Sequence, residues 1–102
     1  MSDTTLIQDF IAWGAKLTAG SRSPNVSINA EICTPTANSA AKIDFENSKF
    51  LARATLWSDG DFYAEAVDAA TAATIISEHG HVAAGVDFGE EFSDILKLFE
   101  IY

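Results

Sequence analysis

His79 and His81, with Glu78 directly before them, come nearest in this sequence to a metal site. Side chains two positions apart on a strand point to the same face, so the two imidazoles would lie together and Glu78 would point to the other face. A structural zinc site needs four ligands, and a catalytic one needs three plus a water. Because no third ligand is evident, we predict no metal site here. We expect instead two surface histidines near a loop, which titrate near neutral pH and modulate an interface.

Asp59 and Asp61 flank the turn residue Gly60 and could be read as a pair of catalytic carboxylates. Acids in turns more commonly bind the backbone of the turn itself. The sequence also has no phosphate-binding glycine loop, no Gly-x-Ser-x-Gly elbow and no zinc-protease helix motif. We therefore predict no catalytic residue and no cofactor, and we expect that the protein is not an enzyme.

Trp57 and Tyr63 are of the residue types that anchor protein interfaces, and acids surround them in the sequence. Aromatic anchors ringed by acids suit a basic protein partner. The partner-binding residues predicted for this surface are Trp57, Asp59, Asp61, Tyr63, Glu65, Asp44 and Glu46. The competing interpretation is that Trp57 folds over its own sheet and shields it from solvent.

These residues need elements to position them, and the first predicted element is a helix from about Thr4 to Ala19. Its apolar residues recur at three- and four-residue spacing: Leu6, Phe10, Trp13 and Leu17. Gly20 fits a left-handed stop after the helix. Gly14 lies near the apolar stripe, where a missing side chain would let a sheet approach closely.

Alternation of apolar and polar residues predicts strands over 26–33 and around Ile43 and Phe45, with a loop over 34–40 between them. Two more strands follow, joined by a turn at Ser58, Asp59 and Gly60. A last strand is expected over 74–79, after a turn over 68–73 that lacks glycine, and a loop over 80–85 follows it.

The turn around Gly60 sets the register of its two strands, and two geometries compete. A two-residue Asp-Gly turn would pair Trp57 with Phe62. A three-residue loop with Gly60 left-handed would pair Leu56 with Phe62 and put one alanine-rich set on a single face: Phe50, Ala52, Ala54, Leu56, Phe62, Ala64 and Ala66. We favour the three-residue loop, because the other register mixes small apolar and charged residues on both faces.

Asp87 is expected to cap a C-terminal helix whose apolar face is Phe88, Phe92, Ile95, Leu96 and Phe99. Its acids are the second group of predicted partner-binding residues: Asp87, Glu90, Glu91 and Asp94. The resulting fold class is α+β. It has an N-terminal helix, a four- to five-stranded antiparallel meander sheet and a C-terminal helix, with the helices packed on one sheet face.

The length of 102 residues indicates a single domain, 1–102, and the formal net charge of -9 makes that domain strongly acidic. Such a field repels nucleic acid and anionic membranes, so direct binding to either is not expected. It attracts basic proteins and speeds their encounter. Cys33 is the only cysteine, and the sequence shows no secretory signal and no apolar run of membrane-spanning length, which predicts a cytoplasmic protein.

The run FLARATLWSDGDFYAEAVDAATAATIISEHGHV resembles the bacterial immunity proteins of the TriTu family. The resemblance rests on an aromatic-led strand that ends in Trp57, then Gly60 and Phe62, then the acid-alanine pair Asp68-Ala69 before a turn containing threonine. It extends from about Ile43 onward through the final acidic helix. One departure is Ala72, in a turn where relatives place a glycine.

The resemblance implies an antidote that binds the C-terminal toxin domain of a large exported protein, in contact-dependent growth inhibition or a related interbacterial system. Such toxins are commonly nucleases, and some act on transfer RNA with help from elongation factor Tu, so a toxin complex with that factor is a second form of the partner. Inhibition is by binding, through occlusion of the active site or through an exosite. The alternative function is an acidic secretion chaperone for an effector protein.

Overall fold

The computed structural model describes residues 5–20, 26–33, 40–83 and 85–99. The elements follow in chain order: α1 (Thr5–Gly20), β1 (Ser27–Cys33), β2 (Ala40–Glu46), β3 (Phe50–Trp57), β4 (Asp61–Asp68), β5 (Thr74–His81), α2 (Phe88–Glu91) and α3 (Ser93–Leu98). The predicted α+β class is confirmed. None of the helices in these ranges is long and apolar enough to cross a membrane.

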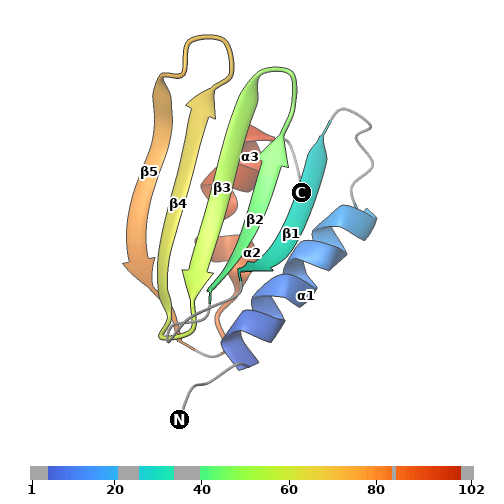
Figure 1. The fold of residues 1–102 in the computed structure, drawn as a ribbon, viewed down its shortest axis with the longest axis vertical. Coiled ribbons are helices and arrows are strands. Elements are labelled where there is room, and N and C mark those ends of the chain that lie inside the picture. Colours follow the sequence, from blue (N-terminus) through green and yellow to red (C-terminus); the bar gives the residue numbers. More distant parts are fainter. Residues whose placement is uncertain (1–4, 21–25, 34–39, 84, 100–102) are drawn as a thin grey trace.

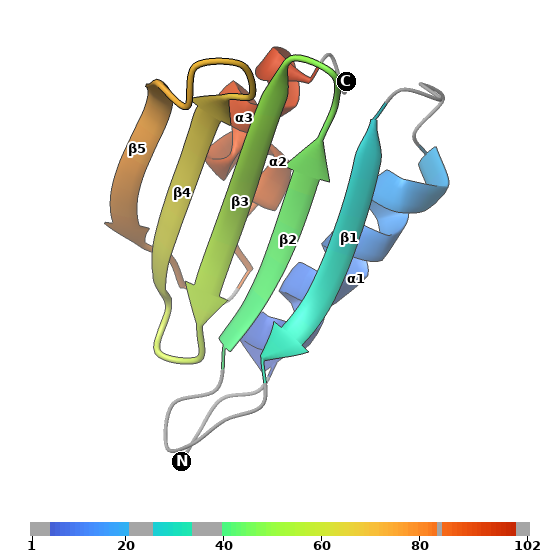
Figure 2. The ribbon, with the colours of Figure 1, turned by 45° about the horizontal axis from the view of Figure 1, so that its top comes forward.

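The five strands form one antiparallel meander sheet in the order β1-β2-β3-β4-β5. Figures 1 and 2 show α1 beside β1 and β2, and α2 with α3 behind the middle of the sheet, all on the same side of it. The opposite face has no helix over it in the described part of the chain. We call the helix-covered side the inner face and the other side the open face.

The β3–β4 hairpin adopts the three-residue loop, as predicted. Leu56 pairs with Phe62, and Gly60 has a φ of 98°, in the left-handed region that glycine adopts without a steric cost. The Gly60 amide donates a hydrogen bond of 2.9 Å to the Trp57 carbonyl and closes the loop. This register fixes which side chains of β3 and β4 reach each face.

Small side chains line the middle of the inner face, and the alanines there are fully or almost fully buried: Ala41, Ala52, Ala54, Ala64 and Ala66. The helices place large aromatic rings over them. Phe92 packs against Phe62 at a ring-centroid distance of 5.1 Å, and Phe99 packs against Phe45 at 5.7 Å. In the core, aromatic rings therefore pack over a sheet face whose middle is lined by alanines.

Gly14 lets α1 lie directly on the sheet, as the sequence predicted. A Cβ atom at this position would lie 2.8 Å from Ile43 Cδ1 and 2.9 Å from Ala30 Cβ, both too short for a real contact. On the same helix, Phe10 is completely buried, and its ring contacts Phe88 and Phe92 at 5.3 and 5.9 Å. The helix therefore reaches both the sheet and the C-terminal segment.

The prediction of a single C-terminal helix is wrong, because the chain forms two short helices there. Asp87 caps α2 as predicted, but Phe92 has φ −105° and ψ 25° and separates α2 from α3. The Phe92 ring packs onto both Phe10 and Phe62, and this packing holds the backbone outside the α-helical region. The predicted apolar face is kept, since Phe88, Phe92, Ile95 and Phe99 are buried and Leu96 is half-buried.

Three element ends also differ from the prediction. Gly20 belongs to α1 and has no left-handed backbone, because a glycine in an exposed last turn costs at most about 1 kcal/mol. Ala40 starts β2 by pairing with Trp57, and residues 34–39 of the expected loop lie outside the described ranges. β5 runs on to His81, since the missing side chain of Gly80 leaves room for the Phe62 ring.

The turn between β4 and β5 is held by Asp68. Its carboxylate accepts hydrogen bonds from the amides of Ala70 and Thr71 at 2.8 and 3.0 Å, and these bonds lower the pKa of Asp68. Ala72 has a φ of 61°, which places an alanine in the left-handed region. Its amide donates to the Asp68 carbonyl at 2.8 Å. The turn therefore forms with alanine instead of glycine at position 72, but the backbone of Ala72 is strained.

Replacing Gly14 by leucine should destabilise the protein by about 2 to 3 kcal/mol, because the new side chain must push α1 off β1 and β2. Urea denaturation followed by circular dichroism measures this free energy. Gly20→Leu is the matched control, since no atom lies within 4 Å of a Cβ there. Equal stability of the two variants would show that α1 does not depend on the close approach at Gly14.

Replacing Ala72 by glycine should raise the free energy of unfolding by about 1 kcal/mol, because glycine removes the steric cost of the left-handed backbone. Ala70→Gly, two positions earlier in the same turn and without a positive φ, should be neutral or destabilising. Thermal and urea denaturation of both variants give the comparison. A loss of stability in Ala72→Gly would contradict the strain assigned to this turn.

Candidate functional site

The open face of the sheet carries an excess of carboxylates. The register places five acids on it, Glu31, Asp44, Glu46, Asp61 and Glu65, against two cations, Lys42 and Arg53. Because no described helix covers this face (Figure 2), its side chains meet solvent directly. Six of the seven partner-binding residues predicted around Trp57 share this face, and Asp59 stands at the tip of its hairpin.

A hollow of about 820 Å³ lies where the β3–β4 hairpin meets the end of β5, and we call it the hairpin hollow. Its lining residues are Trp57, Asp61, Phe62, Tyr63, His79, Gly80 and His81. Trp57 and Tyr63 are half-buried, so each ring rests on the sheet while part of it faces the hollow. The structure thus brings together two predicted aromatic anchors, one predicted acid and both histidines.

Two cross-strand contacts order the side chains of the hairpin hollow. Asp61 pairs with His81 in the β4–β5 register, and His81 Nδ1 lies 2.9 Å from Asp61 Oδ1. Tyr63 pairs with His79, and their rings meet edge to face at 4.7 Å. The imidazoles point to one face, as predicted, and His81 ends β5 next to the loop that follows. Both rings contact side chains of β4.

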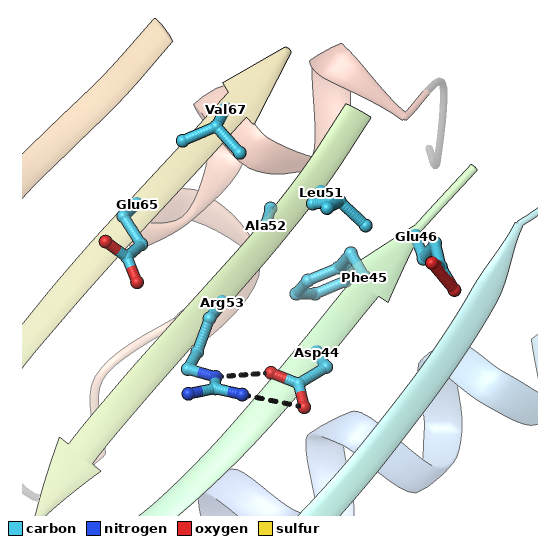
Figure 3. Close-up of a pocket in the computed structure, with 8 residues that line it drawn as sticks. All are labelled: Asp44, Phe45, Glu46, Leu51, Ala52, Arg53, Glu65 and Val67. Atoms are coloured by element: carbon cyan, nitrogen blue, oxygen red, sulfur yellow. Dashed lines mark hydrogen bonds and ion pairs between the residues drawn. The ribbon is translucent and has the colours of Figure 1, made fainter. Parts of the chain in front are cut away.

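A second hollow of about 470 Å³ lies over β2, β3 and β4, and we call it the central hollow. Figure 3 shows Arg53 turned toward Asp44, with Glu65 across from it on β4 and Leu51 and Val67 at the other end. Arg53 Nε donates to Asp44 Oδ1 at 2.6 Å, and a second guanidinium nitrogen donates to Oδ2 at 3.4 Å. A two-point contact of this kind satisfies much of the charge of Asp44 within the protein.

Asp59 has the turn role that its position predicted. Its Oδ1 accepts a hydrogen bond of 3.0 Å from the amide of Asp61. Among the described residues, no group of three or more histidine, cysteine, aspartate or glutamate side chains could hold a metal ion.

The second predicted group of acids lies on the helices, behind the sheet (Figure 1). Asp87 Oδ1 accepts from the Glu90 amide at 3.2 Å and caps α2, so its role is structural as well as electrostatic. Glu90, Glu91 and Asp94 are exposed. The predicted partner-binding residues therefore form two surfaces, on opposite sides of the sheet, which one rigid contact patch cannot include together.

Glu78 joins the helix-side acids, on the face opposite the histidines that the sequence predicted for it. It pairs with Ala64 on the inner face of β5, as the alternation required, and there it approaches α2 and α3. Although the Glu78 side chain is exposed, slight desolvation by its neighbours raises its pKa, and a hydrogen bond to Asp94 together with the charges of Asp94 and Glu91 raises it further. The free protein thus holds like charges close together at this edge.

The comparison with known families decides which class of protein carries these surfaces. The family model described as "Immunity protein TriTu" matches residues 8–98, nearly the whole chain. The chain belongs to the TriTu immunity protein family. Among curated proteins, no sequence matches this chain. The resemblance that the sequence motifs indicated is confirmed, and it includes α1, where those motifs are weak.

The sequence predicted His79 and His81 as surface histidines that modulate an interface, but it missed the β4 residues that they contact in this TriTu immunity protein. A β-bulge at Ala66 and Val67 shifts the β4–β5 register, and the turn before β5 has no glycine to mark it. The period-two spacing of the histidines was the available signal. It gave their common face but not their partners on β4.

The crowding around Glu78 in the TriTu immunity protein predicts a pH-dependent stability. A carboxyl with a raised pKa in the folded state binds its proton more tightly there, so the folded state loses stability as pH rises through that value. Glu78→Gln should therefore be more stable than the parent at neutral pH, by about 0.5 kcal/mol since the group is exposed.

The difference should vanish below about pH 4, where the glutamate is protonated in both states. Urea denaturation at both pH values measures it. Glu90→Gln, which removes an exposed acid of α2, is the control for a general charge effect. A constant gain at all pH values would contradict the assigned cause.

Proposed function

We propose that this immunity protein neutralises a nuclease toxin by binding the basic surface of the toxin with the open face of its sheet. The observation that carries the proposal is the combination of exposed acids with half-buried aromatic rings on a face that no described helix covers. Membership in a family of immunity proteins supports a cognate toxin as the partner. It also favours inhibition by binding over catalysis.

Charge complementarity points to a nuclease. An enzyme that holds nucleic acid needs cationic side chains for the phosphates. A protein of net charge -9 is attracted to such a surface and associates with it rapidly. Once bound, it prevents phosphates from reaching the same cations. The proposal covers direct occlusion of the active site and binding beside it, because both use the same charge contrast.

The partner that fits best is the basic C-terminal toxin domain of a large exported protein, delivered by contact-dependent growth inhibition or a related interbacterial system. Transfer RNA is the substrate class that we propose for this toxin, and a complex of toxin with elongation factor Tu is an alternative form of the partner. The immunity protein would act in the cytoplasm, where such a toxin meets RNA. The helix-side acids of α2 and α3 are available for a second contact with the toxin or its complex.

A tagged pull-down from the native host, with the bound protein identified by mass spectrometry, tests this function. We expect a one-to-one complex with the C-terminal region of a large exported protein. That fragment should arrest growth when expressed alone and be harmless when this chain is co-expressed. Capture of the N-terminal region of an effector, together with a dimeric state of this chain, would instead indicate a secretion chaperone.

Trp57→Ala and Asp61→Lys should each weaken the toxin complex by more than about 1 kcal/mol, which is about fivefold or more in Kd. The first removes an aromatic contact, and the second places a cation against a basic surface. Isothermal titration calorimetry of purified toxin with each variant measures the loss. Glu90→Lys is the matched charge reversal on the helix side. If only Glu90→Lys weakens binding, the interface lies on the helices and not on the open face.

A further inference from the structure

We infer that the hairpin hollow is a receptor for one arginine side chain of the toxin. The inference rests on the proposed function for the identity of the partner, but the chemistry of the hollow is independent of it. The hollow combines one carboxylate, Asp61, with the rings of Trp57, Tyr63 and His79. This is the combination that recognises a flat organic cation, through an ion pair at the edge of the cation and aromatic contact with its face.

The charge of Asp61 distinguishes this hollow from the rest of the open face. Asp44 is paired with Arg53 in the central hollow, and Glu31 lies 4.0 Å from Lys42. Among the described residues, no lysine or arginine lies within ion-pair distance of Asp61, and its partner there is His81, a side chain that is neutral in one of its two states. Asp61 therefore has no lysine or arginine partner within the described part of the chain, and its carboxylate is available to an incoming cation.

The geometry leaves Asp61 accessible. Its side chain is 64% exposed, and His81 beside it is 63% exposed. His81 engages Oδ1, which leaves Oδ2 as an acceptor for a guanidinium group. The ring of His81 itself rests against the hairpin, because a Cβ at Gly60 would lie 2.9 Å from His81 Cε1. The imidazole thus fixes the carboxylate at the mouth of the hollow.

The aromatic residues form the rest of the receptor. The register places Trp57 at the end of β3 beside Asp61, and Tyr63 two residues further along β4, on the same face. Tyr63 is held from the β5 side by the edge-to-face contact with His79, and its hydroxyl lies 3.4 Å from Ser77 Oγ. A guanidinium is flat and weakly hydrated, so it stacks on such rings more readily than an ammonium does. This favours arginine over lysine.

The test is an NMR titration of the full ¹⁵N-labelled chain with the blocked tripeptide Gly-Arg-Gly. Gly-citrulline-Gly, in which the side chain is nearly the same shape but neutral, is the matched control ligand. We expect the Trp57 indole and the amides of Tyr63 and His79 to shift with the arginine peptide and at least fivefold less with the citrulline peptide. The Trp13 indole, packed against Phe88 and Phe92, should not move.

Two variants sharpen the test. Asp61→Asn should reduce the apparent affinity at least fivefold, and Trp57→Phe, which keeps a ring, should reduce it less. Equal shifts with both peptides, shifts centred on Arg53 and Asp44, or no shift at all would each overturn the arginine receptor. Because the titration contains no toxin, such a failure leaves the immunity function to its own co-expression test.

Discussion

The close approach of the helices to one face of the sheet is the constraint on which the rest of the structure depends. Alanines line the inner face, and Gly14 brings the α1 backbone against Ile43 and Ala30. Large rings from α1, from α2 and from Phe92 between α2 and α3 then fill the space above the alanines. The short alanine side chains in the middle of this face leave room for the helices to pack close to the sheet. The other face is left open as a direct result.

The open face gives the many acids of this protein a place where they remain hydrated. In a chain of 102 residues with net charge -9, the acids repel one another. One such repulsion is that of Glu78 by Asp94 and Glu91. Acids placed on an uncovered sheet face keep their hydration and stay available to a partner. Arg53 and Lys42 lower the repulsion within the face, while Asp61 is held by a histidine instead. A basic toxin surface would relieve the repulsion that remains.

Most of the fold could be predicted from the sequence, because the signals were local. The alternation along β3 and β4 and the left-handed glycine at 60 gave the register, and the alanine-rich face gave the side that the helices cover. The break at Phe92 was not predictable, since it depends on packing with Phe10 and Phe62, which lie far away in the sequence. The hairpin hollow depends likewise on the bulged β4–β5 register, so its aromatic residues and acid were found but its histidine partners were not.

The central claim is that the open face of the sheet, rather than the helix side, receives the toxin. Carboxyl footprinting of the free protein and of its purified complex with the cognate toxin tests this claim most directly, because the two sets of acids lie on opposite sides of the sheet. The account predicts that Asp44, Glu46, Asp61 and Glu65 lose reactivity in the complex while Glu90 and Asp94 keep theirs. Protection of Glu90 and Asp94, with unchanged labelling of the open face, would contradict it.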